Sequence, residues 1–344
     1  MKIFKYLLWF LAFFLLAFIS FLGYFTVNNY NPKEKKILTD EEFPDTIKGD
    51  TAEMLIWNIG YAGLGDDMSF FYDGGEKVRT TEKRTKENLQ RIIKVIKSFN
   101  NLEFILLQEV DRHSKRSYYI NESDSLNKYL PNYISAFAFN YKVDFVPVPL
   151  NKPLGRVEGG LMTLTRKAPG HFARYSFPGN FAWPKSLFML DRCFLTAEYH
   201  LSGGKKLYLI NTHNSAYDDG DLKEQQMEYL KKFITKLYGN GHYVIVGGDW
   251  NQLPPGHQSK KSMVKKRIPN NYLPSEWKWV YDQDIPSNRA LNKPYDESNK
   301  TSIIDYYLLS PNLKVIECRT IDLDFQHSDH QPVYLKFSFD NENT

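Results

Sequence analysis

Short apolar runs alternate along the chain with polar segments, and several of the runs end in charged or amide side chains. Apolar runs of this length that are bounded by polar residues are typical of buried β-strands. We expect strands at 53–60, 103–111, 133–140, 158–166, 192–200, at the start of 206–220, and at 244–251, 277–281, 302–310 and 315–323.

Two other segments have the spacing of helices. In 79–99, apolar side chains recur at Leu89, Ile92, Ile93 and Ile96, which lie on one face of a helix. The segment 221–238 has the same pattern, and each segment lies between two strand runs. Strands outnumber helices and some neighbouring strands have short connections, so we expect mixed rather than wholly parallel sheets.

The N-terminal pattern is different, because residues 6–27 form an uncharged run of 22 residues. As a helix it would be about 33 Å long at 1.5 Å per residue, which matches a hydrocarbon core of about 30 Å. It is longer than the apolar part of a signal peptide and lacks a clear cleavage site. We therefore expect an uncleaved, single-pass transmembrane signal anchor, with a cleaved secretory signal as the alternative.

The positive charges on the two sides of this segment are nearly equal in number, so they do not decide its orientation in the membrane. Lys2 and Lys5 precede it, and Lys33, Lys35 and Lys36 follow it. A short tail before a first span usually stays in the cytoplasm, so we expect the remainder of the chain on the extracytoplasmic side.

We divide the chain into one folded domain and its flanking segments. One domain is expected because the polar strand ends are spread over the whole region after the linker. The divisions are a tail at 1–5, the anchor at 6–27, a polar linker at 28–50, the domain at 51–339 and a tail at 340–344.

Composition narrows the chemistry only a little. A formal net charge of +4 is a mild bias toward anionic partners and not the signature of a dedicated nucleic-acid binder. Two cysteines, Cys193 and Cys318, are too few for a metal site built mainly on thiolates, and we interpret both as buried thiols. No dinucleotide fingerprint, P-loop or serine elbow is present to favour redox or acyl-transfer chemistry.

The candidate chemistry lies where the predicted strands end. Carboxylates for a hard divalent cation, beside imidazole and amide donors for an anion, are what phosphate-ester hydrolysis requires. The side chains of this kind are Asn58, Glu109, His213, Asp249, Asn251, Asp305, Asp329 and His330. Gln108, Asp111, Asn211 and Asn214 lie at the same strand ends.

Seven motifs, taken in order, resemble the endonuclease/exonuclease/phosphatase superfamily with its deoxyribonuclease-I-like fold. They are WN at 57–58, QE at 108–109, GGLMTLTR at 159–166, NTH at 211–213, GDWN at 248–251, IDYYLLS at 304–310 and SDHQPV at 328–333. Each motif alone is weak, but seven in the family's order over 51–339 are a strong signal. The resemblance implies a four-layer α-β-β-α sandwich of two mixed sheets behind the N-terminal transmembrane helix.

The same resemblance, together with residue chemistry, implies roles for the candidate residues. Glu109 is the best metal ligand, because a carboxylate buried alone at a strand end would be costly. We expect Asn58, Glu109 and Asp329 to hold the metal, with Mg²⁺ expected and Mn²⁺ or Ca²⁺ as alternatives. The catalytic set is His213, Asp249, Asn251, Asp305 and His330.

Residue order leaves some of these roles open. Asp249 and Asn251 are two apart, so on an extended segment they would face the same way. Either Asp249 or His330 could act as the general base.

The sequence therefore predicts a membrane-anchored, divalent-metal-dependent hydrolase of phosphate esters. A phosphodiesterase acting on nucleic acid or on a phospholipid head group is favoured. The alternatives are an inositol-phosphate-type phosphatase and a non-catalytic, membrane-tethered binding module of the same fold. The membrane is an expected partner through the N-terminal helix, and no obligate protein partner is evident.

One long insertion carries a separate expectation. The segment 252–274 contains Lys260, Lys261, Lys265, Lys266 and Arg267. It could grip an anionic substrate or a phospholipid surface beside the site, or it could be a solvated basic loop.

Overall fold

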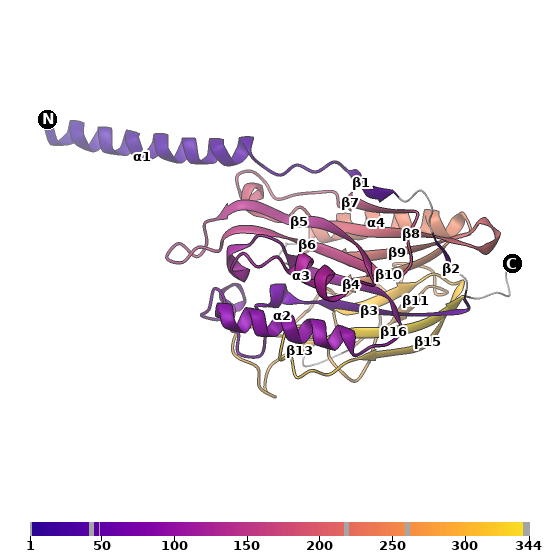
Figure 1. Ribbon diagram of the computed structural model, residues 1–344. Helices are drawn as coiled ribbons and strands as arrows, with labels where there is room; N and C mark the ends of the chain where they lie inside the picture. Colours follow the sequence, from indigo (N-terminus) through magenta and orange to yellow (C-terminus); the bar gives the residue numbers. More distant parts are fainter. Residues whose placement is uncertain (1, 41–44, 48, 217–219, 259–261, 340–344) are drawn as a thin grey trace.

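Two β-sheets packed face to face form the centre of the domain (Figure 1). The computed structural model describes residues 2–40, 45–47, 49–216, 220–258 and 262–339. Among these residues the larger sheet has eight strands, the smaller has six, and a separate two-stranded ribbon joins β12 (Asn288–Arg289) to β13 (Thr301–Ser302).

Strand order places long-range neighbours side by side. The larger sheet runs β1 (Lys35–Asp40), β7 (His171–Ser176), β8 (Cys193–Leu201), β9 (Lys206–His213), β10 (Tyr243–Asp249), β14 (Asp305–Leu309) and β11 (Lys278–Val280), with β2 (Thr46–Ile47) paired to β8. The smaller runs β15 (Leu313–Thr320), β16 (Val333–Phe339), β3 (Thr51–Asn58), β4 (Leu102–Asp111), β6 (Gly155–Thr165) and β5 (Ile134–Val146).

Both sheets are mixed, as expected. In the larger sheet β9 and β10 are parallel, and in the smaller sheet β3 and β4 are parallel, while most other pairs are antiparallel. Because the carboxyl ends of parallel strands meet at one edge of a sheet, each sheet delivers two strand ends to the same side.

Apolar side chains between the sheets form the main core. Ile56 and Leu106 of the smaller sheet and Leu195 and Leu209 of the larger sheet are fully buried in one cluster. Alternation along each strand explains this, because every second side chain faces the opposite sheet. Both candidate thiols are free cysteines among the described residues, Cys193 fully buried and Cys318 partly buried.

Helices cover the two outer faces and complete four layers. α2 (Glu82–Lys97) and α3 (Glu122–Tyr129) lie on the smaller sheet, and α4 (Asp221–Gly239) lies on the larger sheet. α2 begins later than its apolar pattern suggested because Thr81 caps it, its side chain accepting a hydrogen bond from the Arg84 amide. The four-layer sandwich of two mixed sheets is confirmed.

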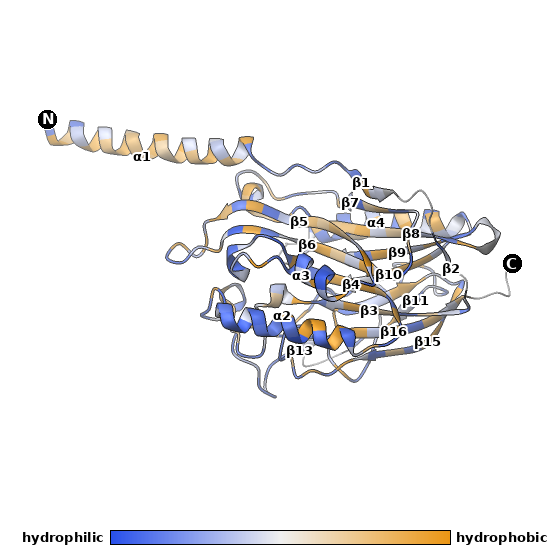
Figure 2. Cartoon of the chain, in the orientation of Figure 1, coloured by the Kyte–Doolittle hydropathy of each residue, from blue (hydrophilic) through white to orange (hydrophobic). Residues whose placement is uncertain are grey.

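The N-terminal helix stands apart from the layers. α1 (Lys2–Val27) is long and apolar enough to cross a membrane, a property that a signal sequence shares, and its most apolar window has no buried residue. It is apolar along most of its length and projects from one end of the domain (Figure 2).

The expected linker at 28–50 is corrected by the structure. β1 pairs with β7 at one edge of the larger sheet, and β2 pairs with β8. The lysines of β1 made the segment look like a polar linker in the sequence. An edge strand tolerates exposed charged side chains, and Leu38 packs against the core. The tail at 340–344 and the lysines Lys260 and Lys261 lie outside the described residues.

A buried polar bridge locks the two sheets together near their common edge. The Gln108 side-chain amide donates to Asn211 Oδ1 over 2.7 Å. The Asn211 amide in turn donates to the carbonyls of Leu107 and Met162 at 3.0 and 3.1 Å. Gln108 and Asn211 therefore serve the packing of the sheets on which the candidate site is built.

Candidate active site

Backbone register brings three of the candidate side chains into one row. In the larger sheet, Asp249 at the end of β10 pairs with His213 of β9 on one side and with Asp305 of β14 on the other. In the smaller sheet, Asn58 ends β3 and pairs with Gln108 of β4. The two sheet edges therefore face each other with polar side chains between them.

A β-bulge sets the position of Glu109. Leu107 and Val110 of β4 pair with Met162 and Gly160 of β6, so two residues of β4 oppose a single residue of β6. Glu109 has a φ of 53°, in the left-handed region that non-glycine residues rarely adopt. The bulge leaves the Glu109 side chain 24% exposed, two residues before the end of β4, whereas its neighbours Gln108 and Val110 are buried.

Asn58 connects the carboxylates of the two sheets. Its Nδ2 donates to Glu109 Oε1 at 3.1 Å and to Asp249 Oδ2 at 3.0 Å, while its Oδ1 accepts from the Gly60 amide. Gly60 has a φ of 50°, and a Cβ there would lie 2.9 Å from Asp329 Oδ1. The turn after β3 is thus shaped to let Asp329 approach.

His330 and Asp305 form a buried pair. His330 Nδ1 lies 2.8 Å from Asp305 Oδ2, which also accepts a 2.7 Å hydrogen bond from Ser287. Burial alone would lower the pKa of His330, but the facing carboxylates of Asp305, Asp329 and Asp249 raise it well above the ordinary value. The facing carboxylates therefore favour the protonated form of His330.

His213 has the opposite character. Its Nε2 lies 3.4 Å from Asp249 Oδ2, and its buried Nδ1 has no hydrogen-bond partner among the described residues. Burial and the nearby guanidinium of Arg192 lower the pKa of His213 well below the ordinary value. A neutral imidazole with its proton on Nε2 can donate a hydrogen bond into the site.

The buried carboxylates hold their protons unusually strongly. Burial raises the pKa of Asp249 to about 6 and that of Asp329 to about 7. His330 works against this rise in both cases, yet does not cancel it. Four carboxyl groups that are partly or fully removed from water form a cluster that can accept a cation.

Two expectations about the strand ends are corrected. β10 ends at Asp249, and Asn251 lies beyond it with a φ of 51°, so the two side chains do not share an extended segment. Asp249 Oδ1 accepts from the Asn251 amide at 2.9 Å, while the Asn251 side chain donates to the Asn214 carbonyl at 3.0 Å. Asp111 is engaged elsewhere, in a two-point ion pair with Arg116 at 3.0 and 2.9 Å.

Sequence reasoning missed Ser287 and Asn288. The Ser287 hydroxyl donates to Asp305, and Asn288 Nδ2 lies 3.0 Å from His330 Nε2. They belong to a short polar segment around β12, which has no periodic pattern. The sequence shows only two adjacent polar residues here. Such a pair is as common in a surface turn as in an active site, so it does not predict a functional role.

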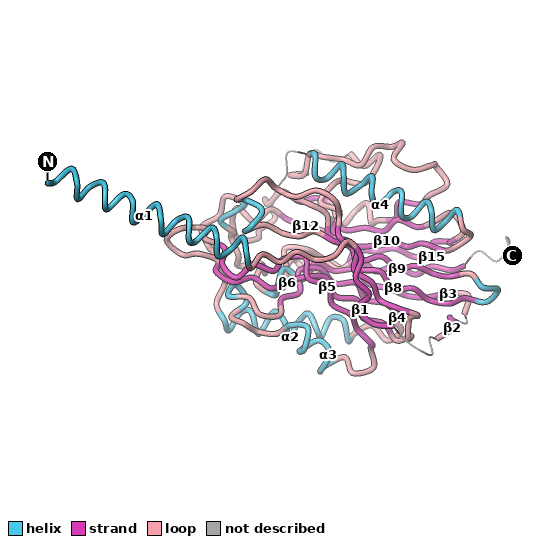
Figure 3. The backbone as a smooth tube through the Cα atoms, turned by 90° about the horizontal axis from the view of Figure 1, so that it is seen from above, coloured by secondary structure: helices cyan, strands magenta, loops and turns pink. Residues whose placement is uncertain are grey.

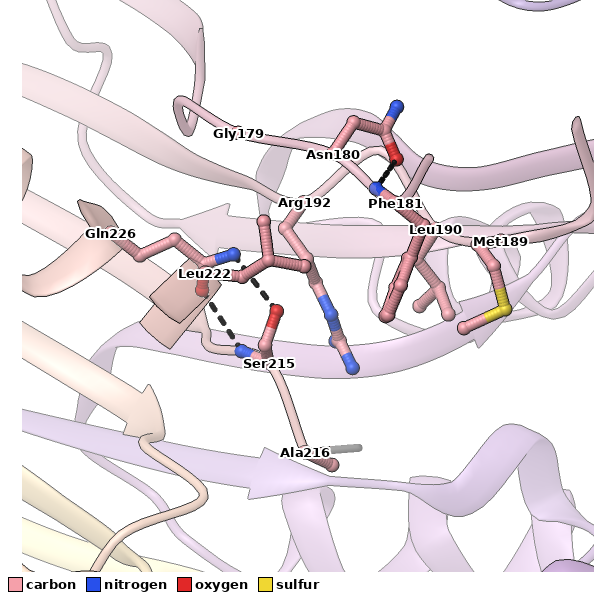
Figure 4. A pocket seen from close by; sticks show the side chains of 10 residues that line it. All are labelled: Gly179, Asn180, Phe181, Met189, Leu190, Arg192, Ser215, Ala216, Leu222 and Gln226. Atoms are coloured by element: carbon pink, nitrogen blue, oxygen red, sulfur yellow. Dashed lines mark hydrogen bonds between the residues drawn. The ribbon is translucent and has the colours of Figure 1, made fainter. Parts of the chain in front are cut away.

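A small cavity borders the strand end that carries His213 (Figure 4). Arg192 projects into it, and its Nη1 donates to the His213 carbonyl over 3.4 Å. Opposite, the Gln226 side chain accepts from the Ser215 amide and donates to its hydroxyl. Phe181 and Leu190 supply an apolar wall, so the cavity combines a cation with apolar surface beside the site.

Comparison with protein families agrees with this geometry. The model of the Endonuclease/Exonuclease/phosphatase family matches residues 55–330. The chain belongs to this family. Membership identifies it as a phosphoesterase of the metal-dependent kind that the family comprises. No curated protein sequence matches the chain.

Solved structures of endonuclease/exonuclease/phosphatase proteins share the fold. The protein from Beutenbergia cavernae is 18% identical, with a TM-score of 0.61 over 85% of this chain and 72% of that one. The protein from Bacteroides vulgatus is 16% identical, with a TM-score of 0.55 over 85% and 100%. ANGEL2, described as a 2',3'-cyclic phosphatase, is 16% identical, with a TM-score of 0.55 over 90% and 100%.

Proposed function

We propose that this chain is a membrane-anchored, divalent-metal-dependent phosphodiesterase whose site is the polar cluster between the two sheet edges. The observation that carries the proposal is the convergence of Asp249, Asp329 and the Asp305–His330 pair in one buried group, with the partly exposed Glu109 at its edge. Such a group is expensive to bury without a bound cation or anion to balance it.

Chemical character supports a hard divalent cation at this place. Burial raises the pKa of Asp249 to about 6 and that of Asp329 to about 7, and a bound cation would stabilise their poorly solvated charged forms. Glu109 and Asp329 would hold the cation, because carboxylate oxygens are ligands that Mg²⁺ prefers. Asn58 would orient the carboxylates beside it, since its Nδ2 donates to Glu109 and Asp249 while its Oδ1 accepts from the Gly60 amide. The bound cation would neutralise charge on the phosphoryl oxygens.

A second grouping of ligand atoms is less suitable. Atoms of Asp249, Asp305 and His330 all lie within 4.8 Å of one another. Asp305 Oδ2, however, accepts from Ser287 and lies 2.8 Å from His330 Nδ1, so among the described residues only its Oδ1 lacks a partner, and the same carboxylate favours a protonated His330. We therefore keep Asp305 and His330 as a pair that acts on the substrate.

Proton positions assign the remaining roles. We assign Asp249 as the general base that takes the proton of the attacking water, because the Asp305 carboxylate 2.8 Å from His330 Nδ1 favours a protonated imidazole, which is the poorer proton acceptor. His330 and the neutral His213 donate to the oxygens of the phosphoryl group, where negative charge accumulates. Asp305 orients His330, and the backbone amide of Asn251 positions Asp249 by donating to its Oδ1.

α1 supports the membrane anchor, since its apolar surface is not covered by the domain. A cleaved signal sequence is the competing interpretation, and the two differ in whether the mature chain retains residues 2–27. Mass determination of the N-terminus after expression in a membrane-containing host separates them.

The function is tested with the full chain reconstituted into phospholipid vesicles. Plasmid DNA, sphingomyelin, phosphatidylinositol and inositol phosphates are supplied in parallel, with Mg²⁺ or with EDTA, and Glu109→Ala serves as the matched variant. We expect Mg²⁺-dependent hydrolysis of a phosphodiester that is lost with EDTA and in Glu109→Ala. A folded chain that hydrolyses none of these substrates would overturn the proposal in favour of a binding module, and hydrolysis of inositol phosphates alone would favour a phosphatase.

A further inference from the structure

The edge of the domain that bears the site is also the edge from which two loops rise. In the smaller sheet, Asp111 of β4 pairs with Gly159 of β6, and the β5–β6 hairpin continues past this level to its tip at 147–154. In the larger sheet, Phe194 of β8 pairs with Thr212 of β9. The loop 177–192 that precedes β8 therefore leaves beside His213.

The second of these loops holds the end of α1. Phe188 packs against Phe21 and Phe25, with ring centroids 6.0 and 5.4 Å apart. Trp183 Nε1 donates to Thr26 Oγ1 over 3.2 Å. In a bilayer, Trp183 would therefore lie at the same depth as the last turn of α1.

The hairpin is tied into the same arrangement. Tyr141 of β5 donates its hydroxyl to the Phe188 carbonyl at 3.0 Å. Both views show α1 projecting from the end of the domain where the β5–β6 hairpin tip lies (Figures 1 and 3). The site edge, the hairpin tip and the membrane-length helix consequently face one direction.

The exposed side chains at this end suit a lipid interface. Leu150 at the hairpin tip is 88% exposed and Trp183 is 61% exposed. Lys152 and Lys185 are exposed beside them, and Lys185 Nζ lies 4.1 Å from the centre of the Phe181 ring. Tryptophan and lysine next to apolar side chains are typical of residues at a membrane–water boundary.

We infer that the site-bearing edge rests on the bilayer that α1 spans, with Leu150 and Trp183 in the interface, and that the substrate is the phosphodiester head group of a membrane lipid. This inference rests on the proposed function and selects one of its substrate classes. A site held against the bilayer meets lipid head groups at high local concentration, whereas a long duplex nucleic acid would have to enter between the domain and the membrane.

Orientation is tested first, by a readout that is independent of activity. An environment-sensitive fluorophore is attached at Leu150→Cys in the full chain carrying Cys318→Ser, since Cys193 is fully buried. The matched control is Ile134→Cys, which lies 39% exposed at the start of β5, the opposite end of that strand. The chain is reconstituted into phosphatidylcholine–phosphatidylglycerol vesicles with or without spin-labelled lipid.

We expect spin-labelled lipid to quench the Leu150 label at least about twofold more than the Ile134 label, because such quenching needs close approach to lipid. Equal quenching of the two labels would overturn the inference. Because Leu150 points into solvent, its replacement leaves the fold intact.

The substrate is tested with Leu150→Ser, with Ile134→Ser as the control. We expect turnover of lipid in vesicles to fall about tenfold in Leu150→Ser, as expected when one leucine no longer enters the interface. Turnover of soluble bis(p-nitrophenyl) phosphate stays unchanged in both variants. If the native chain hydrolyses DNA but no lipid, the inference about the substrate is overturned while the proposed function stands. If the native chain hydrolyses none of the substrates but the Leu150 label is still quenched selectively, the proposed function is refuted while the orientation on the bilayer is supported.

Discussion

Replacing Asp305 by asparagine removes the negative charge that faces His330 and keeps the size of the side chain. The two partners are 2.8 Å apart and only 1% and 6% exposed, so water does not compensate for the change. Breaking a buried charge pair of this kind costs about 3 kcal/mol or more. At about 1.4 kcal/mol per tenfold, that is a loss in kcat of roughly 150-fold if the pair acts in the transition state.

Initial rates of bis(p-nitrophenyl) phosphate hydrolysis in Mg²⁺, followed from pH 5 to 9, measure this loss. Asp305 is the first of the carboxylates that raise the pKa of His330. Without it His330 loses its proton at lower pH, so the remaining activity should shift toward acid. Ser287→Ala removes only a 2.7 Å hydrogen bond to the same carboxylate and should cost less than about tenfold. An Asp305→Asn enzyme within about threefold of the native kcat, with the same pH profile and unfolding temperature, would refute the assigned role.

Three further predictions concern the metal and the stability of the domain. Glu109→Gln should weaken Mn²⁺ binding by calorimetry at least about tenfold, since a carboxylate ligand is replaced by an amide; unchanged affinity would remove Glu109 from the ligand set. Asn211→Ala removes three buried hydrogen bonds, to Gln108 and to the carbonyls of Leu107 and Met162, so the free energy of unfolding in urea should fall by about 3 kcal/mol, and a loss below about 1 kcal/mol would contradict the bridge. Burial raises the pKa of Asp191 from 3.8 to about 6 in the folded chain. The protonated Asp191 therefore contributes its full share to the stability of the fold below pH 3.8, and this share is lost as the pH rises through about 6. Asp191→Asn should therefore raise the free energy of unfolding by about 1 kcal/mol at pH 7.5, after allowance for partial exposure, but not at pH 4, and an equal effect at both pH values would exclude this cause.

Much of the fold was predictable because the two sheets bury long apolar runs. Ile56 and Leu106 face the opposite sheet in strands whose pattern is visible without a structure. The first of these strands ends in Asn58 and the second carries Glu109 two residues before its end, while His213 and Asp249 end two strands of the larger sheet. Parallel pairing brings the carboxyl ends of neighbouring strands together. Most residues of the candidate site could therefore be predicted from the polar residues near the ends of the predicted strands.

Local backbone geometry was not predictable from the pattern. A one-residue bulge at Glu109 changes which side chains of β4 face the site, and it leaves Asp111 to pair with Arg116. A left-handed φ at Asn251 turns its side chain away from the direction of Asp249. Both depend on contacts with other strands and loops, which residue order does not contain.

Short elements without periodicity were also invisible. β12 has two residues, yet it positions Asn288 beside His330. β1 is a lysine-bearing edge strand whose pairing with β7 overrides its polar composition. Tertiary pairing, rather than local preference, forms both elements.

Hydrolysis of bis(p-nitrophenyl) phosphate by the full chain, before and after removal of divalent metal, tests the central claim most directly. With Mg²⁺ the native chain should turn over the ester, EDTA should abolish turnover, and added Mg²⁺ should restore it. Asp249→Asn should lower kcat by about 10³ with the fold intact, as expected for loss of a general base. Turnover that survives EDTA, or that is the same in Asp249→Asn, would contradict a metal-dependent phosphoesterase site between the two sheet edges.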